Sequence, residues 1–156
     1  MKNKFSGLLC LIVLALIIRL LYSCTPSACL GETTAYLKAG FYQSGTGKPY
    51  TPDSVTVYGI GLNGNMLYNN ATKLSSIWLP LDASSGTCGF IMKINNITDT
   101  LSFTYSGYPY LISKECGYTF FFNLDSCIWK GSIIDTINIR NKKITIFNDE
   151  NIRIFY

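Results

Sequence analysis

The chain has 156 residues, of which 48% are hydrophobic and 14% charged, and its formal net charge is +4. Its basic residues form no long run, which argues against the phosphate-binding surface that a nucleic-acid partner requires. Because the chain contains no histidine, it lacks the side chain most used for acid–base catalysis and for metal binding.

The first residues have the order of a secretory signal peptide. Lys2 and Lys4 precede an apolar run over residues 5–18, and the small residue Ser23 stands directly before Cys24. This order is typical of a lipobox, in which the cysteine becomes the lipidated first residue of an exported protein. The sequence therefore predicts acylation, palmitate included, at Cys24.

This interpretation divides the chain into a signal-peptide helix (residues 1–23), a lipidated tether (24–28) and one β-domain (29–156). Two alternatives stay open: an uncleaved membrane anchor over residues 5–22, and a secreted protein that keeps its cysteine as a thiol. All three place residues 25–156 outside the cytoplasm. Removal of the leader leaves 133 residues with 10 basic and 9 acidic side chains, enough for one domain with a buried core.

The mature chain keeps four cysteines besides the predicted lipid site: Cys29, Cys88, Cys116 and Cys127. An even number of cysteines in an oxidising compartment predicts disulfides, with buried free thiols as the alternative. A zinc site is not expected, because the chain has no histidine and no Cys-x-x-Cys spacing.

Four cysteines allow three connectivities, and sequence alone does not choose among them. We favour a bridge between Cys29 and Cys116, with Cys88 and Cys127 as the second pair if a second exists. Cys29 precedes the first long predicted strand, where a bridge would hold the start of the domain near its tether. Cys116 lies in the irregular segment 113–117, where a bulge would turn its side chain off the regular ladder.

The mature sequence is β-rich and shows no helical stripe. Residues 34–42 alternate between apolar and polar side chains, which predicts a half-buried strand with Tyr36 on its polar face. Further strands are predicted at residues 54–60, 66–68, 75–79, 89–94, 101–105, 133–139, 144–147 and 152–156. Residues 110–112 and 117–122 are predicted to form the return strand after 101–105, with a bulge at residues 113–116. We expect a turn at residues 106–109 and a hairpin around Asn141-Lys142. This spacing predicts an all-β fold, an antiparallel β-sandwich of about seven to nine short strands.

Several segments of the mature chain match one family pattern. They are Cys29, Leu37–Tyr42, Asp53-Ser54, Val57–Gly59, Leu67–Asn69, Leu79–Leu81, Asp99–Leu101, Ser113, Glu115–Gly117 and Glu150–Tyr156. In these segments the chain resembles a group of small lipoproteins of unknown function from Bacteroides-like bacteria. The resemblance implies an immunoglobulin-like β-domain on a lipid anchor, and it brings no catalytic residues.

The same resemblance bears on localisation. Surface-exported lipoproteins of such bacteria carry an acidic run after the lipidated cysteine, and residues 25–28 contain no acid. We therefore expect a protein held at the periplasmic face of the outer membrane.

The nine acidic residues form no recognisable catalytic pair. They are Glu32, Asp53, Asp82, Asp99, Glu115, Asp125, Asp135, Asp149 and Glu150. Most stand at predicted strand starts or turns, where an aspartate caps backbone amides. No Asp-x-Asp-x-Asp spacing supports calcium, and no Ser-x-x-Lys motif follows Cys24. We expect no catalytic residue, no bound metal and no cofactor.

Three triplets consist of an aspartate, a hydroxyl residue and an aliphatic residue: Asp53-Ser54-Val55, Asp99-Thr100-Leu101 and Asp135-Thr136-Ile137. Such triplets resemble the O-glycosylation sequence of exported proteins in Bacteroides-like bacteria, which predicts modification at Ser54, Thr100 or Thr136. The alternative is that each triplet is a capped start of a strand.

Eight aromatic residues cluster within residues 105–129. They suit either the core of a sandwich or a face that binds carbohydrate or peptide. We expect a non-enzymatic, lipid-anchored envelope protein with a binding or structural role, and its protein or glycan partner is left open. The alternatives are a carbohydrate- or calcium-binding module and an enzyme with an unrecognised site.

Overall fold

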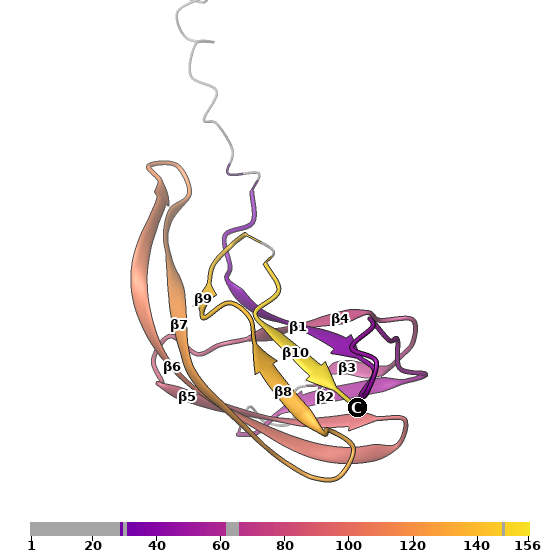
Figure 1. Ribbon diagram of the computed structural model, residues 1–156. Coiled ribbons are helices and arrows are strands. Elements are labelled where there is room, and N and C mark those ends of the chain that lie inside the picture. Colours follow the sequence, from indigo (N-terminus) through magenta and orange to yellow (C-terminus); the bar gives the residue numbers. More distant parts are fainter. Residues whose placement is uncertain (1–28, 30, 62–65, 148) are drawn as a thin grey trace, which may run out of the picture. The chain divides into compact units, whose positions relative to one another are not determined.

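The computed structural model describes residues 29, 31–61, 66–147 and 149–156 (Figure 1). The chain forms two compact units, Met1–Leu30 and Gly31–Tyr156. The predicted signal-peptide helix and the lipidation site lie outside the described residues. Where the chain is described, no helix has the length and apolar character needed to cross a membrane.

The second unit is an all-β sandwich, so the predicted fold class is confirmed. Its described residues contain ten strands and no helix. The strands are β1 (Tyr36–Tyr42), β2 (Val55–Gly59), β3 (Met66–Ala71), β4 (Ser76–Pro80), β5 (Thr87–Ile94), β6 (Ile97–Ser113), β7 (Gly117–Lys130), β8 (Thr136–Ile139), β9 (Lys143–Ile144) and β10 (Ile152–Phe155).

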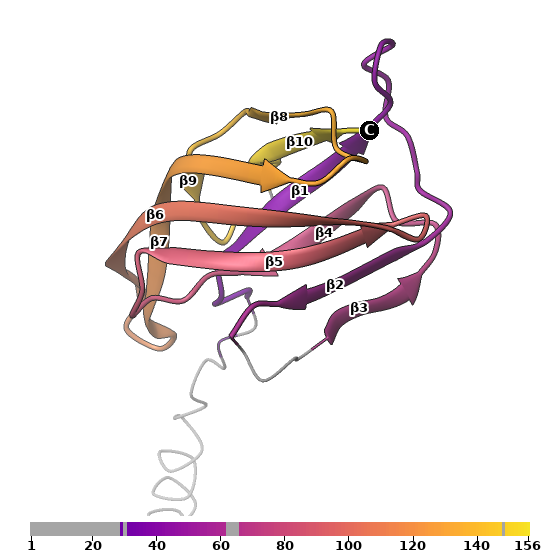
Figure 2. The same cartoon turned by 90° about the horizontal axis from the view of Figure 1, so that it is seen from below.

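The strands form two sheets. One sheet has the order β4-β1-β10-β8, and the other has the order β3-β2-β5-β6-β7-β9. Among the described strands every pairing is antiparallel except that of β1 with β10, which run parallel with Ala39 opposite Ile152. The first and last strands of the domain are therefore neighbours in the middle of one sheet (Figure 2).

Alternating side chains explain why these segments become strands. In β1, Leu37 and Phe41 are buried as the alternation predicted, and Tyr36 on the opposite face is exposed. The second sheet contributes Phe90 from β5 and Phe103 from β6, whose ring centroids lie 6.0 Å apart. Burial of such apolar faces between two sheets is the main driving force for folding a sandwich.

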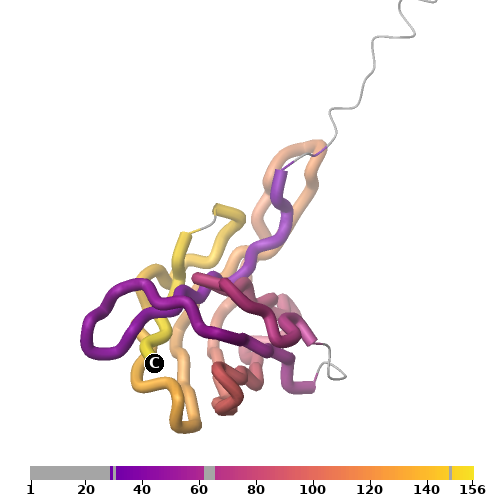
Figure 3. The backbone as a smooth tube through the Cα atoms, turned by 90° about the vertical axis from the view of Figure 1, so that its right-hand side faces the viewer, coloured from indigo at the N-terminus to yellow at the C-terminus, as the bar shows by residue number. Residues whose placement is uncertain are grey.

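Strands β6 and β7 form a much longer hairpin than the sequence predicted. Residues 106–109, which we expected to turn, continue as strand, with Pro109 opposite Phe120. The pairing of β5 with β6 ends at Thr104, so one edge of β6 carries no ladder bond from β5 beyond that point, and a proline is tolerated in such a segment. The outer part of the hairpin, residues 106–123, is here named the arm. Its inner end still pairs with β9 at Phe122 and Asn123, and its outer end projects beyond the other strands (Figures 1 and 3).

The predicted hairpin around Asn141-Lys142 is wrong. Strand β8 pairs with β10 in the first sheet, whereas β9 pairs with β7 in the second. The buried side chain of Asn151 holds the crossing between the sheets. Its amide donates to the carbonyls of Asn141 (3.1 Å) and Lys143 (2.9 Å), and its oxygen accepts from the Lys38 N–H (2.9 Å). One side chain thus satisfies three backbone groups, two in the segment where a hairpin was predicted and one in β1.

Candidate functional site

A shallow pocket lies on the exposed face of β1 and β4. It has a volume of about 320 Å³ and is lined by Glu32, Thr34, Tyr36, Trp78, Thr145 and Ile146. Tyr36 is 39% exposed and Trp78 is 40% exposed, so both rings are accessible to a ligand. The pocket combines two aromatic side chains with hydroxyl and carboxylate groups. Its size and composition are typical of a site for a small ligand.

Strand register brings the two rings of the pocket together. Lys38 is opposite Trp78, and Tyr36 is opposite Pro80, so Tyr36 and Trp78 are diagonal neighbours on one face. The Lys38 ammonium lies 5.6 Å from the centroid of the Trp78 ring, within the range of a cation–π contact. The backbone N–H of Trp78 donates a 2.9 Å hydrogen bond to the hydroxyl of Tyr68. Lys38 thus contacts the ring of Trp78, and Tyr68 holds its backbone.

Sequence reasoning missed this pocket, although it placed Tyr36 on the polar face of its strand. An aromatic residue on the exposed face of a strand was the available signal. Trp78 is distant in sequence, and its partnership with Tyr36 depends on the pairing of β1 with β4.

Cys88 and Cys127 are free thiols, so the predicted second disulfide is not formed. Both residues lie opposite Phe103 of β6, Cys88 from β5 and Cys127 from β7. Two strands that flank a third are separated by roughly 9–10 Å, more than the roughly 7 Å between Cα atoms that a disulfide spans. Strand β6 therefore keeps the two thiols apart.

The two free thiols are not activated nucleophiles. Burial raises the pKa of Cys88 to about 11 and the pKa of Cys127 to about 12. A hydrogen bond between Cys88 and the Tyr105 hydroxyl partly opposes the rise at Cys88. Because a thiol reacts as its thiolate, these groups behave near neutral pH as small apolar side chains.

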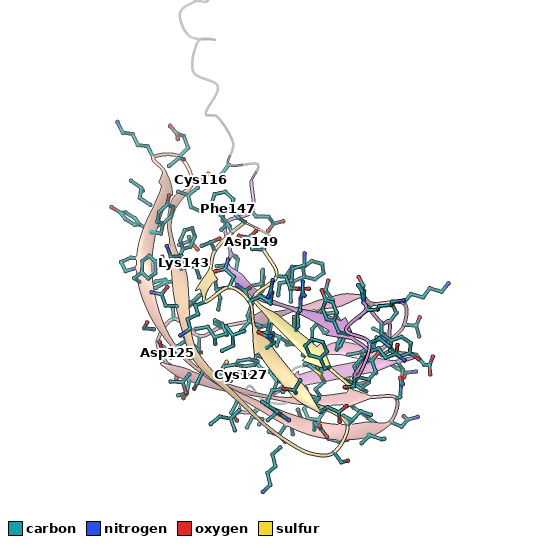
Figure 4. The ribbon with its side chains drawn as sticks, in the orientation of Figure 1. Cys116, Asp125, Cys127, Lys143, Phe147 and Asp149 are labelled. Carbon is teal, nitrogen blue, oxygen red and sulfur yellow. The ribbon has the colours of Figure 1, made fainter. Side chains whose placement is uncertain are left out.

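The predicted bridge between Cys29 and Cys116 is present. Cys116 lies in the turn between β6 and β7, at the tip of the arm (Figure 4). The hydroxyl oxygen of Ser113 accepts hydrogen bonds from the backbone N–H groups of Glu115 (3.2 Å) and Cys116 (3.0 Å), and Gly117 has a φ of 72°. The bulge predicted there is thus wrong, because the segment is the capped turn between β6 and β7, and this turn presents Cys116 for bridging.

Aromatic side chains cover one face of the arm. The rings of Tyr110 and Phe121 stack with centroids 4.1 Å apart, and Tyr108 packs edge-on against Phe121 at 6.2 Å. Phe121 is buried as part of the hydrophobic core, whereas Tyr108 and Tyr110 stay partly exposed. The stack therefore packs this face of the arm against the core of the sandwich.

The other face of the arm exposes a second apolar group near the tip. Leu111 is opposite Tyr118, and Phe120 follows two residues later on the same face. Their exposed fractions are 47% for Leu111, 74% for Tyr118 and 42% for Phe120. We name these three side chains the tip patch. The aromatic cluster predicted at residues 105–129 is therefore divided, because some of its rings fill the core and others are exposed.

Asp99 is a structural carboxylate. It is 1% exposed, and its oxygens accept hydrogen bonds from the N–H groups of Ser132 (2.8 Å), Ile133 (3.2 Å) and Ile134 (2.9 Å). It caps a turn more than thirty residues away instead of the local start of a strand. In the described part of the chain, no group of three or more His, Cys, Asp or Glu side chains is placed to hold a metal ion.

The three predicted glycosylation positions differ in accessibility. Ser54 is half-buried, and its N–H donates to the side-chain oxygen of Asn95 at 3.2 Å. Thr100 is half-buried within β6, between partners on β5 and β7. Thr136 is exposed and begins β8, the edge strand of its sheet. Of the three, Thr136 is the position that a modifying enzyme reaches most easily.

The fold and its features define a β-sandwich domain with a disulfide-tied hairpin arm and an aromatic pocket. The chain belongs to a family of unknown function, DUF6452, whose model matches residues 54–156. The match includes Trp78, the arm and both free thiols, whereas Tyr36 in β1 precedes it. No curated protein and no solved structure matches the chain.

Proposed function

We propose that the protein is a lipid-anchored envelope protein whose β-sandwich binds a glycan and catalyses no reaction. The order of residues 1–24, a basic start, an apolar run and a small residue before Cys24, supports the lipid anchor. The free thiols have raised pKa values and the buried carboxylate of Asp99 holds a turn, so both favour a binding role over a catalytic one.

The observation that carries glycan binding is the aromatic pair Tyr36 and Trp78 in the pocket. The flat face of an aromatic ring packs against the C–H face of a pyranose ring, and hydroxyl and carboxylate groups around it accept hydrogen bonds from sugar hydroxyls. Thr34, Thr145 and Glu32 supply such groups at the rim. The pocket thus offers partners for both the C–H face and the hydroxyl groups of a sugar.

The proposal extends to the place of the protein in the cell. We propose that it is a lipoprotein of a Bacteroides-like bacterium, held at the periplasmic face of the outer membrane, with an immunoglobulin-like sandwich. The absence of acidic residues at positions 25–28 supports the periplasmic face. Two packed sheets of mostly antiparallel strands support the sandwich type. Envelope polysaccharides are the glycans that such a protein would meet.

Titration of the purified full-length lipoprotein, in detergent micelles, with a panel of neutral and acidic oligosaccharides tests the proposal. Saturation-transfer NMR identifies a binding sugar, and titration gives its affinity. Trp78→Ala should weaken binding about two- to tenfold, because an aromatic contact contributes about 0.5–1.5 kcal/mol. Trp78→Phe should restore part of the affinity. Ile128→Ala, which changes a side chain that is 65% exposed on β7, is the matched control.

Equal affinities for Trp78→Ala and Ile128→Ala would contradict the pocket as the glycan site. Loss of binding when a chelator is added would instead favour the calcium-binding alternative.

A further inference from the structure

We infer that the tip patch, formed by Leu111, Tyr118 and Phe120, docks into the interfacial layer of the membrane that carries the lipid anchor. The inference rests on the proposed lipidation of Cys24 and adds a second membrane contact, made by protein side chains. It also assigns a role to the bridge between Cys29 and Cys116.

The covalent path from the lipid to the arm is short. Cys29 follows Cys24 by five residues, and a fully extended chain of this length spans at most about 18 Å. The disulfide then passes directly to Cys116, at the turn of the arm. The bridge therefore confines the tip of the arm close to the membrane surface.

The composition of the tip patch suits a membrane interface. Tyr118 is the most exposed large hydrophobic residue of the described chain, and Phe120 and Leu111 extend the same apolar face. Tyrosine rings are enriched at membrane–water interfaces, where the ring is apolar and the hydroxyl stays hydrated. Such a cluster on a projecting hairpin is costly to leave in water and favourable to place among lipid headgroups.

The backbone and charges of the arm set the depth of this contact. A two-stranded hairpin has unpaired edge groups, which the hydrocarbon core does not tolerate but the hydrated headgroup layer does. The turn carries Lys114 and Glu115, both exposed and of opposite charge. Their charges cancel, and the lysine stem reaches toward lipid phosphates. The arm is therefore suited to lie in the interface and not to cross the bilayer.

The small size of the tip patch favours a membrane over a second protein copy. Three side chains fall far short of the roughly 800 Å² that each partner of a stable protein complex buries. A membrane contact needs less area, because the lipid chains already supply the affinity and the patch only orients the domain.

Photocrosslinking in intact membranes tests the inference. p-Benzoylphenylalanine replaces Tyr118 or Phe120 in the full-length protein, and Ile128, which is 65% exposed near the opposite end of β7, is the matched control position. After irradiation the protein is purified and its mass is measured for phospholipid adducts. Adducts at Tyr118 and Phe120 should exceed those at Ile128 severalfold. Removing the bridge with Cys29→Ser and Cys116→Ser should lower the Tyr118 adduct severalfold without releasing the protein from membranes.

The outcomes separate this inference from the proposed anchor. A protein that fractionates with membranes but gives equal adducts at Tyr118, Phe120 and Ile128, or that crosslinks into a dimer through Tyr118, overturns the docking and leaves the anchor intact. A protein recovered without lipid in the aqueous fraction overturns both. Because the comparison of Phe120 with Ile128 uses the bridged protein, it decides the question even if the bridgeless variant misfolds.

Discussion

The hydroxyl of Tyr42 donates a hydrogen bond of 2.7 Å to Oε2 of Glu150, which joins β1 to the segment just before β10. The Arg153 Nε binds the other oxygen of the same carboxylate at 2.6 Å, and its guanidinium lies 4.6 Å from the centroid of the Tyr42 ring. A Cβ at position 40 would overlap the Glu150 carboxylate, so Gly40 leaves the space that this carboxylate occupies. These side chains add to the backbone ladder that pairs the first strand with the last.

Tyr42→Phe should lower the free energy of unfolding by about 1–2 kcal/mol, because it removes a hydrogen bond to a charged acceptor. Arg153→Met should cost less, since the ion pair of Arg153 with Glu150 is about one-third exposed and solvent screens it. Urea denaturation of the purified variants measures both effects. A Tyr42→Phe variant as stable as the original protein would show that the bond contributes nothing.

Asp99→Asn should lower the free energy of unfolding by about 2–3 kcal/mol. An amide has one acceptor oxygen, whereas a carboxylate has two. The substitution therefore leaves buried N–H groups without an acceptor. Asp53→Asn is the control. Asp53 is exposed and stands in the same sequence context, so its change should stay within about 0.5 kcal/mol. Thermal unfolding followed by circular dichroism compares the two. Similar losses for both variants would mean that the bonds of Asp99 are not what stabilises the turn between β7 and β8.

Local pattern was enough to predict the fold class and most of the strands, although it placed a turn at residues 106–109 and missed the strand over residues 123–130. The alternation around Leu37 and Phe41 predicted the buried face of β1 because a strand exposes every second residue to one side. The irregular segment around Cys116 was also a local signal, and it led to the correct disulfide partner for Cys29, although it is a turn and not the predicted bulge. Properties that depend on neighbouring residues in the chain could therefore be predicted from the sequence.

Properties that depend on which strands are neighbours in space could not be predicted from the sequence. The predicted pair Cys88 and Cys127 is an example. The sequence does not show that β6 lies between the two strands that carry these cysteines. The pocket of Tyr36 and Trp78 depends in the same way on the register of β1 with β4. Between β8 and β9 the chain crosses from one sheet to the other, and the side chain of Asn151 bonds the backbone of this crossing. The sequence around Asn141-Lys142 is typical of a turn and does not predict such a crossing.

Glycosylation, if the triplets direct it, should fall on Thr136. The side chain of Thr136 is exposed on an edge strand, whereas Thr100 is half-buried within β6. Intact-mass measurement of the protein from its native host should show a glycan increment that Thr136→Ala removes and Thr100→Ala retains. A mass equal to polypeptide plus lipid in the unmutated protein would rule out modification at all three triplets.

The raised pKa values of the free thiols predict how the free energy of unfolding changes at alkaline pH. Unfolded cysteine ionises at its ordinary pKa of 9.0, whereas burial raises the pKa of Cys88 to about 11 and that of Cys127 to about 12 in the folded domain. The fold therefore favours the neutral thiols. Their contribution to stability is complete below about pH 9 and is lost as the pH rises through 9 toward 11 and 12.

The double variant Cys88→Ala and Cys127→Ala should lose less stability over this interval than the original protein. Urea denaturation at neutral pH and at about pH 10.5 measures the difference, since the unfolded thiols are then ionised while the folded ones are largely neutral. A residual slope should persist, because burial also raises the pKa of Tyr105 to about 12. If both proteins lose stability equally, the thiols do not ionise on unfolding in that range. Recovery of a peptide that links Cys88 to Cys127 from non-reduced native protein would explain such a result and would contradict the free-thiol state.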